Sequence, residues 1–258
     1  MMSDTFDQTY ADFSAARRAQ IVARIEAACA RAGRDVSEVS PVAVSKTVGT
    51  GELLAAWRAG WRRFAENRPQ ELTRKLAFVE QTPEMAGAAF DLIGNLQKNK
   101  INQVVGKVGL IHSISSAELA RQVSERSERH GAASDVLLEV NVSGEASKSG
   151  FSPDGLRACV DDVLACPGIR VRGLMTMAPK ADPDCARRTF SGLRELAGEL
   201  RGRTGLALPV LSCGMSDDFE IAIEEGSTLV RLGRVAFDPA YPHQLATANA
   251  PRVGAARK

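Results

Sequence analysis

Eight short runs rich in valine, isoleucine and leucine recur along the chain, each followed by a longer segment with helical spacing of its apolar residues. Most of these runs are almost continuously apolar, which is typical of parallel strands buried on both faces. Eight such strands alternating with helices, without a linker, favour a single closed (β/α)₈ TIM-type barrel. The alternative is an open doubly wound sheet, which usually has fewer strands. The predicted strands are Val39–Ser45, Arg63–Glu66, Phe90–Gly94, Leu110–Ile114, Asp135–Val142, Ile169–Met175, Leu208–Ser212 and Thr228–Leu232.

The segments between these runs carry recognisable helix starts and stops. An extra helix, Ser14–Ala32, is predicted before the first strand and ends at Gly33. Ser216 is expected to cap a helix over Asp217–Glu225. Other starts are predicted at Pro69, Ser116, Ser152–Pro153 and Asp182–Pro183. We therefore divide the chain into an N-terminal tail (1–12), one barrel (13–240) and a C-terminal tail (241–258).

Charge and cysteine content exclude several classes of protein. The 33 basic and 31 acidic residues nearly balance, so no nucleic-acid-binding face is expected. The five cysteines contain no C-x-x-C pair and the three histidines have no ligand spacing, which argues against a disulfide framework or a zinc site. No apolar run is long enough to span a membrane, and the first residues do not resemble a signal peptide. We expect a cytoplasmic protein without membrane or nucleic-acid partners.

The first predicted strand ends in a lysine, Val-Ala-Val-Ser-Lys46. Active sites of such barrels lie at the carboxyl ends of the strands. A lysine there is expected to point into a desolvated mouth, which would lower its pKa and make its amine nucleophilic, as Schiff-base formation requires. From this residue alone, a lysine that reaches out into solvent remains the alternative.

Glycine-containing turns follow the seventh and eighth predicted strands. They read Ser212-Cys-Gly214-Met215-Ser216 and Arg231-Leu-Gly233-Arg234. Loops after these two strands often form a phosphate site in barrels, where hydroxyls and backbone N–H groups surround the anion. The acids that follow Ser216 would repel a phosphate, and a plain helix cap is the alternative. Together with Lys46, these turns suit a cofactor that has one aldehyde and one phosphate.

These stretches, with several others, resemble the pyridoxal-phosphate homeostasis proteins, which are relatives of the N-terminal barrel of alanine racemase. The resemblance extends from about residue 20 to 238. The matching motifs are Ala43-Val-Ser-Lys46, Phe64-Ala-Glu-Asn67 with Gln70-Glu71, Ile93-Gly-Asn-Leu-Gln97 with Asn99-Lys100, Val140-Asn-Val-Ser143 with Ser147-Lys-Ser-Gly150, Gly173-Leu-Met175, Ser212-Cys-Gly-Met-Ser-Asp-Asp218 and Val230-Arg-Leu-Gly233.

The resemblance implies that pyridoxal 5′-phosphate is bound as a Schiff base to Lys46. It implies phosphate contacts from Ser212, Ser216 and Gly233, and it puts Arg231 beside the pyridine nitrogen or the phosphate. The other expected cofactor contacts are Asn67, Asn95, Met175, Gly214, Met215 and Arg234. The chain departs from the family pattern at Ala65, Arg68, Pro69, Asp91 and Asn95, which puts in doubt the fine contacts made by the second and third strand ends.

Amino-acid racemisation on such a barrel requires a second base opposite the lysine. In alanine racemase this base is a tyrosine of a second domain, whereas about 20 residues follow Asp238 here and the two tyrosines, Tyr10 and Tyr241, lie outside the predicted strands. We therefore expect a protein that buffers or delivers the cofactor, with pyridoxal-phosphate-dependent apoenzymes as candidate partners. A weak racemase or other pyridoxal-phosphate enzyme, and a barrel that has lost the cofactor, are the alternatives. A monomer or weak dimer is expected, because no long exposed apolar stripe is readable.

Overall fold

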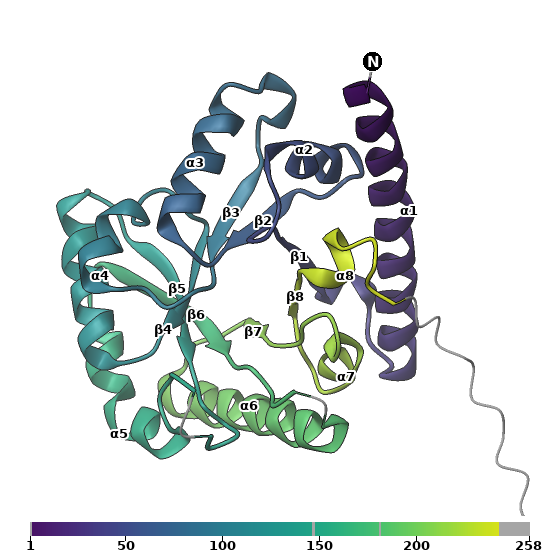
Figure 1. The fold of residues 1–258 in the computed structure, drawn as a ribbon. Helices are drawn as coiled ribbons and strands as arrows, with labels where there is room; N and C mark the ends of the chain where they lie inside the picture. Colours follow the sequence, from purple (N-terminus) through teal and green to yellow (C-terminus); the bar gives the residue numbers. More distant parts are fainter. Residues whose placement is uncertain (1, 146–147, 181, 243–258) are drawn as a thin grey trace, which may run out of the picture.

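The eight strands pair in chain order and close into a parallel barrel (Figure 1). The computed structural model describes residues 2–145, 148–180 and 182–242, with only the backbone for residues 2–7. Pairing of β1 with β8, in the register Ser40 to Leu229, closes the ring, so the predicted barrel is confirmed and the open sheet is excluded. The strands are β1 (Ser40–Val44), β2 (Arg63–Glu66), β3 (Ala89–Leu92), β4 (Leu110–Ile114), β5 (Ser134–Glu139), β6 (Ile169–Met175), β7 (Val210–Ser212) and β8 (Leu229–Leu232).

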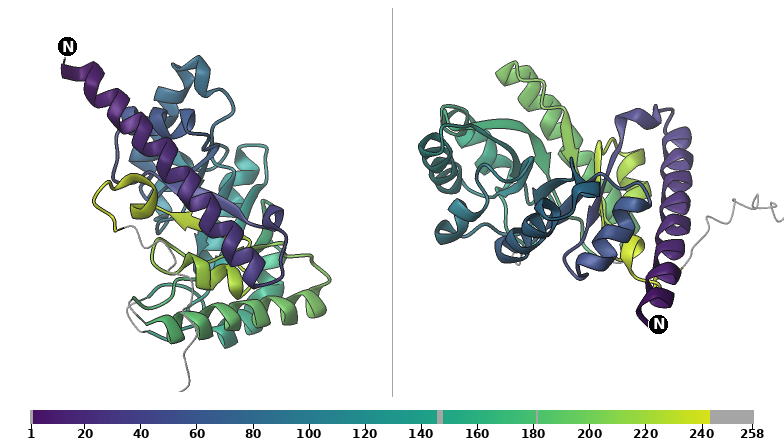
Figure 2. Two further views of the ribbon diagram at one scale, coloured as in Figure 1. Left: turned by 90° about the vertical axis from the view of Figure 1, so that its right-hand side faces the viewer. Right: turned by 90° about the horizontal axis from the view of Figure 1, so that it is seen from above.

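Helices surround the barrel, and a long N-terminal helix packs against its outside (Figures 1 and 2). After β3 the connection is the 3₁₀ helix η3 (Lys98–Gln103), which replaces the usual α-helix. The α-helices are α1 (Met2–Arg31), α2 (Thr50–Arg58), α3 (Pro69–Glu80), α4 (Ala117–Arg129), α5 (Pro153–Leu164), α6 (Pro183–Thr204), α7 (Phe219–Glu224) and α8 (Arg234–Phe237), with shorter 3₁₀ turns η1 (Val36–Glu38) and η2 (Pro83–Met85).

Three of the predicted helix caps are confirmed. The side chains of Ser116, Ser152 and Asp182 each accept a hydrogen bond from a backbone N–H of the first turn, at the starts of α4, α5 and α6. Each of these bonds satisfies one of the N–H groups that a helix start leaves without an intrahelical partner. Several strands are shorter than predicted, because buried apolar residues also extend into the adjoining turns: β5, for example, ends at Glu139.

The predicted N-terminal tail is wrong, because α1 begins at Met2. Its first turns are too polar to show an apolar stripe, so the sequence pattern indicated a helix only from Ser14. Tertiary contact holds this part of α1 against the barrel: the Tyr10 hydroxyl donates a hydrogen bond of 2.9 Å to the carbonyl of Phe237 in α8. Most of the predicted C-terminal tail, residues 243–258, lies outside the described residues.

Two apolar clusters form the core. The larger lies between the strands and the surrounding helices, and includes Ile21 and Ile25 of α1. The smaller fills the inside of the barrel and consists of Val42, Val44, Ala65, Leu110, Leu137, Met175 and Leu229. Charged and polar side chains share the inside of the barrel with this second cluster, in a fold whose interior is usually filled by branched apolar residues.

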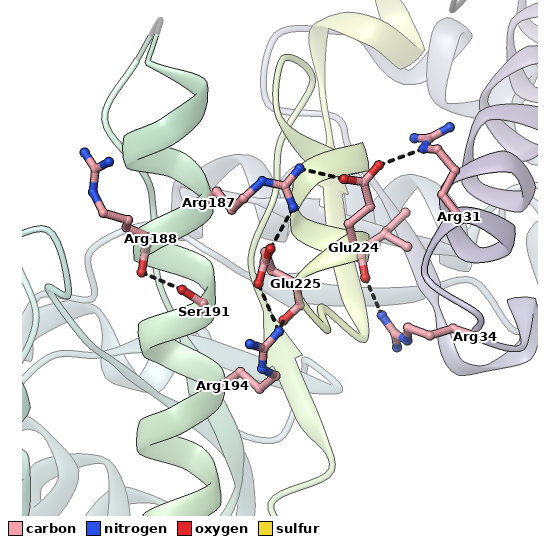
Figure 3. Close-up of polar contacts among 9 residues, drawn as sticks. Arg31, Arg34, Arg187, Arg188, Ser191, Arg194, Glu224 and Glu225 are labelled. Atoms are coloured by element: carbon pink, nitrogen blue, oxygen red, sulfur yellow. Dashed lines mark hydrogen bonds and ion pairs between the residues drawn. The ribbon is translucent and has the colours of Figure 1, made fainter. Parts of the chain in front are cut away.

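Ion pairs connect α7 to the two helices beside it, as Figure 3 shows. Glu224 of α7 pairs with Arg31 of α1 and with Arg187 of α6, at 2.8 and 2.7 Å. Glu225 pairs with Arg187 and with Arg194, at 2.7 and 3.0 Å. The short helix that follows β7 is thus held from both sides.

No helix in the described part of the chain is long and apolar enough to cross a membrane. Within the same residues, no group of three or more histidine, cysteine, aspartate or glutamate side chains is arranged to hold a metal ion.

Candidate functional site

Lys46 follows the carboxyl end of β1 and is exposed to solvent. Strand β1 ends at Val44, and Lys46 belongs to the turn that leads to α2. The expected desolvation of Lys46 is therefore wrong, because Lys46 follows the buried residues of the strand and is exposed. Among the described residues its ammonium group has no hydrogen-bond or ion-pair partner. Its amine is open to a ligand.

A buried ion pair lies directly beneath Lys46. Lys75 of α3 and Glu66 of β2 are both fully buried, with 2.5 Å between Nζ and Oε1. Lys75 also donates a hydrogen bond to the carbonyl of Ser45, the residue before Lys46. The Ser45 hydroxyl donates to the same Glu66 oxygen at 2.6 Å. This cluster fixes the backbone from which Lys46 projects.

Sequence reasoning missed Lys75, although one signal was available. Lys75 comes three residues after Leu72, which is also fully buried, so both side chains lie on the inner face of α3. A lysine in that position requires a buried acceptor. The acceptor, Glu66, belongs to the same Phe-Ala-Glu-Asn motif that carries part of the family resemblance.

The predicted role of Ser216 as the cap of the helix after β7 is wrong. That helix, α7, begins at Phe219 and its N-cap Asp218 makes no side-chain cap bond. The Ser216 hydroxyl oxygen accepts a hydrogen bond of 3.1 Å from the N–H of Val235 in α8. Ser216 thus connects the loop after β7 to the short helix after β8, whose N-cap is Gly233.

Several backbone N–H groups at this junction have no acceptor among the residues that the structure describes. Those of Ser216, Gly233 and Arg234 make no hydrogen bond within the described part of the chain. The N–H of Met215 is used, since it donates to the Asp218 carboxylate at 2.6 Å. Free N–H groups at the start of a short helix after the eighth strand are what a phosphate group requires in this type of barrel.

Gly214 shapes the turn after β7. Its φ is +92°, in the region that favours glycine, and a Cβ there would lie 2.5 Å from the Cβ of Ala222. The absence of a side chain lets the turn pack against α7. At Gly233 a Cβ would lie 3.6 Å from Val44, at the end of β1, so this glycine faces the strand that leads to Lys46.

Asp217 and Asp218, which follow Ser216, would repel a bound phosphate less than two free carboxylates would. Burial raises the pKa of Asp217, but hydrogen bonds from Tyr241 and Arg234 outweigh this effect and lower the pKa overall. The charge of Asp217 is thus balanced by the Arg234 guanidinium. Burial raises the pKa of Asp218, which favours its neutral form.

Arg231 lies almost fully buried on β8, with 4% of its surface exposed. Its Nη1 donates hydrogen bonds to the carbonyl oxygen and the hydroxyl oxygen of Ser212, at 2.7 and 2.6 Å. Its Nη2 donates to the carbonyl of Thr176 at 3.0 Å. A guanidinium has five N–H donors, so two of them have no acceptor among the described residues.

Ser212 is fully buried, and its hydroxyl is held between Arg231 and His112. Its hydroxyl therefore bonds to side chains inside the barrel. His112 and its partner Asp91 are both fully buried as well. Neither was identified from the sequence as a site residue, because each bonds to a residue of another strand: Asp91 of β3 to His112 of β4, and His112 to Ser212 of β7.

The remaining predicted residues lie at or just after the ends of β2, β3 and β6. Asn95, after β3, is exposed, and its side-chain oxygen lies 3.3 Å from the hydroxyl of Ser149. Asn67 follows β2, and its carbonyl would be 2.1 Å from a Cβ at Gly94, so the two loops are in close contact. Met175 is buried in the apolar cluster inside the barrel, beneath these loops.

Glu139, at the end of β5, was also missed. It is 2% exposed and accepts a hydrogen bond of 2.6 Å from Ser149 on one carboxylate oxygen. Its other oxygen has no partner within the described residues. Burial raises the pKa of Glu139, which favours a protonated carboxyl at the mouth.

The chain matches the family model for the N-terminal domain of alanine racemase over residues 17–238. It is 39% identical to the pyridoxal phosphate homeostasis protein of Aquifex aeolicus over 222 residues, which cover 86% of this chain and 96% of that protein. It is 40% identical to the protein of the same name from Pseudomonas aeruginosa over 220 residues, or 85% and 92% of the two chains. Among solved structures, PipY of Synechococcus elongatus with PLP bound superposes with a TM-score of 0.73 at 31% identity, covering 84% of this chain and 99% of PipY.

Proposed function

The chain belongs to the family of pyridoxal phosphate homeostasis proteins, and on that premise we propose that it binds pyridoxal 5′-phosphate through Lys46 and buffers or delivers it inside the cell. The supporting observation is a set of hydrogen-bond donors at the ends of β7 and β8, together with the amine of Lys46 after β1, none of which has a partner among residues 2–145, 148–180 and 182–242. An aldehyde and a phosphate on one small molecule match these two features.

The residues divide into a phosphate end and an aldehyde end. At the phosphate end, the N–H groups of Ser216, Gly233 and Arg234 would bind the anion, with Gly214 and Met215 shaping the turn. Ser212, whose hydroxyl accepts a hydrogen bond from Arg231 inside the barrel, would support that guanidinium instead of contacting the phosphate itself.

At the aldehyde end, the Lys46 amine would condense with the aldehyde, with loss of one water molecule. Bound pyridoxal phosphate supplies an aldehyde carbon that reacts with amines and a ring that can accept electrons. Asn67 and Asn95 would border the ring from the ends of β2 and β3, and Met175 would form an apolar floor below it. The two free N–H groups of Arg231 would donate to an acceptor on the ring or the phosphate.

The two tyrosines support a binding protein over a racemase. The Tyr241 hydroxyl lies 2.9 Å from the carbonyl of Ser216 and 2.6 Å from the Asp217 carboxylate, and burial together with that carboxylate raises its pKa to about 12. The Tyr10 hydroxyl bonds to Phe237 on the outside of the barrel, and burial raises its pKa to about 12 as well. A tyrosine that holds its proton this firmly is a poor base near neutral pH.

The experiment is an absorbance spectrum of the protein with added pyridoxal phosphate, followed by borohydride reduction and peptide mass mapping. We expect a band near 420 nm and a reduced adduct on the Lys46 peptide. Lys46→Ala should lose the adduct, whereas Lys107→Ala, an exposed lysine before β4, should keep it. An adduct that persists in Lys46→Ala would refute the assignment.

Delivery requires a separate test. The loaded protein should restore the activity of a pyridoxal-phosphate-dependent apoenzyme across a short incubation, and the loaded Lys107→Ala control should do the same. We expect a monomer or weak dimer in sizing experiments, and a stable larger oligomer would contradict that expectation. Failure to transfer, with the adduct on Lys46 intact, would leave a buffering role without delivery.

A further inference from the structure

A line of hydrogen-bonded side chains crosses the inside of the barrel and ends at Arg231. The Nε2 atom of His112 lies 3.1 Å from the Asp91 carboxylate, and its Nδ1 lies 3.0 Å from the Ser212 hydroxyl. Ser212 in turn accepts the 2.6 Å bond from Arg231. Because β4 and β7 are not neighbours in the barrel, the bond between His112 and Ser212 spans its interior. We call the series Asp91, His112, Ser212 and Arg231 the interior relay.

The far end of the interior relay is anchored by a second arginine. Arg63, at the start of β2, donates two hydrogen bonds to Asp91, at 2.7 and 3.1 Å. Its side chain is 32% exposed, whereas Asp91 is fully buried. A bidentate arginine defines the orientation of a carboxylate as well as its charge. Asp91 therefore presents a fixed acceptor to His112.

This geometry determines which atom of each group carries a proton. A carboxylate can only accept, so the Nε2 atom of His112 must carry the hydrogen that faces Asp91. Burial lowers the pKa of His112, although the hydrogen bond to Asp91 opposes that shift, and the lowered pKa favours the neutral ring. The Nδ1 atom must then accept, and the Ser212 hydroxyl donates to it. The oxygen of Ser212 is left with its lone pairs directed to Arg231.

Arg231 depends on this arrangement because no carboxylate bonds to it in the described part of the chain. Its three acceptors are two carbonyl oxygens and the hydroxyl of Ser212. If His112 carried its hydrogen on Nδ1, the Ser212 oxygen would accept from both His112 and Arg231, and the Ser212 hydrogen would lose its acceptor. The buried hydroxyl would then be under-satisfied, which weakens the support that it gives to the guanidinium.

We propose that Asp91 and His112 are positioning residues for Arg231, and that the interior relay holds the guanidinium so that its two unbonded N–H groups are available to a ligand at the mouth. The inference rests on the proposed function only for the identity of that ligand. When Arg63 is counted with the interior relay, one positive charge is in excess, since Asp91 pairs with Arg63 and no carboxylate within the described residues bonds to Arg231. An anionic ligand or an unprotonated ring nitrogen is the chemistry that this end of the relay would bind.

The first test uses the protein without ligand. Long-range ¹H–¹⁵N NMR distinguishes the two neutral forms of a histidine ring, and the chain has three histidines, which simplifies assignment. His112 should carry its hydrogen on Nε2 at pH 7. A hydrogen on Nδ1, or a doubly protonated ring, would overturn the proposal whether or not the protein binds pyridoxal phosphate.

The second test is a double-mutant cycle on pyridoxal phosphate affinity, measured by absorbance titration. His112→Phe should weaken binding about tenfold when Arg231 is present, and less than about twofold in an Arg231→Ala background. His112 does not touch Arg231, so this coupling would have to pass through Ser212. Equal losses in the two backgrounds would overturn the proposal, because His112 would then act independently of the guanidinium.

Serine variants separate positioning from general stability. Ser212→Ala should weaken binding by a similar factor, and Ser212→Thr, which keeps the hydroxyl, should restore most of the loss. Ser127→Ala is the matched control, since Ser127 of α4 is also fully buried and bonds to the carbonyl of Val123. If Ser127→Ala weakened binding as much as Ser212→Ala, the effect would be one of stability. If the wild-type protein took up no pyridoxal phosphate, the proposed function would fail. The NMR measurement of the His112 tautomer would still show whether the interior relay has the proposed arrangement.

Discussion

Replacing Lys75 by methionine should destabilise the protein strongly, because it breaks the buried ion pair beneath Lys46. Both side chains are fully buried and their charged atoms are 2.5 Å apart. In the variant, Glu66 would keep only the hydrogen bond from Ser45, since its second oxygen already lacks a partner within the described residues. Methionine is close to lysine in volume, so a cavity adds little to the loss.

Removing one partner of a buried pair typically costs about 3–5 kcal/mol, because the other charge stays buried without compensation. For a domain of this size, each kcal/mol corresponds to a Tm shift of about 2–4 °C. We therefore expect Lys75→Met to lower Tm by roughly 6–20 °C. Urea unfolding, followed by circular dichroism, gives the free energy directly and shows through the slope whether unfolding stays two-state.

Two further variants make this prediction refutable. Lys107→Met removes an exposed lysine and should change the free energy of unfolding by less than about 0.5 kcal/mol. The double variant Lys75→Met with Glu66→Gln should be more stable than Lys75→Met alone, because no net charge remains buried. A single variant within about 1 kcal/mol of the wild type, or a double variant as unstable as the single one, would refute the reasoning.

Three other predictions follow from the structure. Glu225→Gln removes the negative charge that pairs with both Arg187 and Arg194 (Figure 3), and it should cost about 0.5–1 kcal/mol in urea unfolding, less at high salt. Arg188→Ala should cost almost nothing, because the Arg188 side chain has no ion-pair partner among the described residues. Burial lowers the pKa of His112, so as the pH falls the histidine is protonated in the unfolded chain before it is protonated in the folded protein. The wild type should therefore lose stability as the pH falls below about 6.5. This loss should be smaller in His112→Phe, when both proteins are unfolded in urea at pH 7 and at pH 5.5. Gly214→Ala should destabilise the folded protein by at least about 1–3 kcal/mol, because the φ of Gly214 is +92° and the new Cβ would lie 2.5 Å from Ala222. Gly198→Ala, inside α6, should stabilise the folded protein by about 0.5–1 kcal/mol, because no atom lies within 4 Å of the new Cβ. Thermal unfolding measures both effects.

The barrel could be predicted because its signals are local. Continuous apolar runs identify strands buried on both faces, and the caps Ser116, Ser152 and Asp182 bond to N–H groups only three residues away. Ser216 shows that a local sequence signal does not identify a partner that is distant in the sequence. It has the same residue type and the same position before acids, yet its partner is Val235, which is 19 residues away and reaches it only because β7 and β8 are neighbours.

The candidate site was only partly predictable for the same reason. Lys46 and the turns after β7 and β8 are recognisable as short motifs, because each stretch has its chemistry within a few residues. The pairing of Asp91 with His112, or of Glu66 with Lys75, joins residues of different elements, and nothing in a single sequence indicates which buried charge meets which. The exposure of Lys46 depends on where β1 ends, which differs from the prediction by one residue.

The contrast between the two ends of the site bears on whether it serves storage or turnover. The proposed phosphate end is held by several contacts, because Ser216 bonds to α8, Asp217 pairs with Arg234, and ion pairs hold α7 from both sides. At the proposed aldehyde end, Lys46 is exposed and nothing in the described part of the chain bonds to its amine. An enzyme gains rate by excluding water and fixing the reacting groups. A protein that stores or delivers a ligand gains from an exposed attachment point. Water or a competing amine can then release the covalently attached ligand while contacts to its phosphate group still retain it.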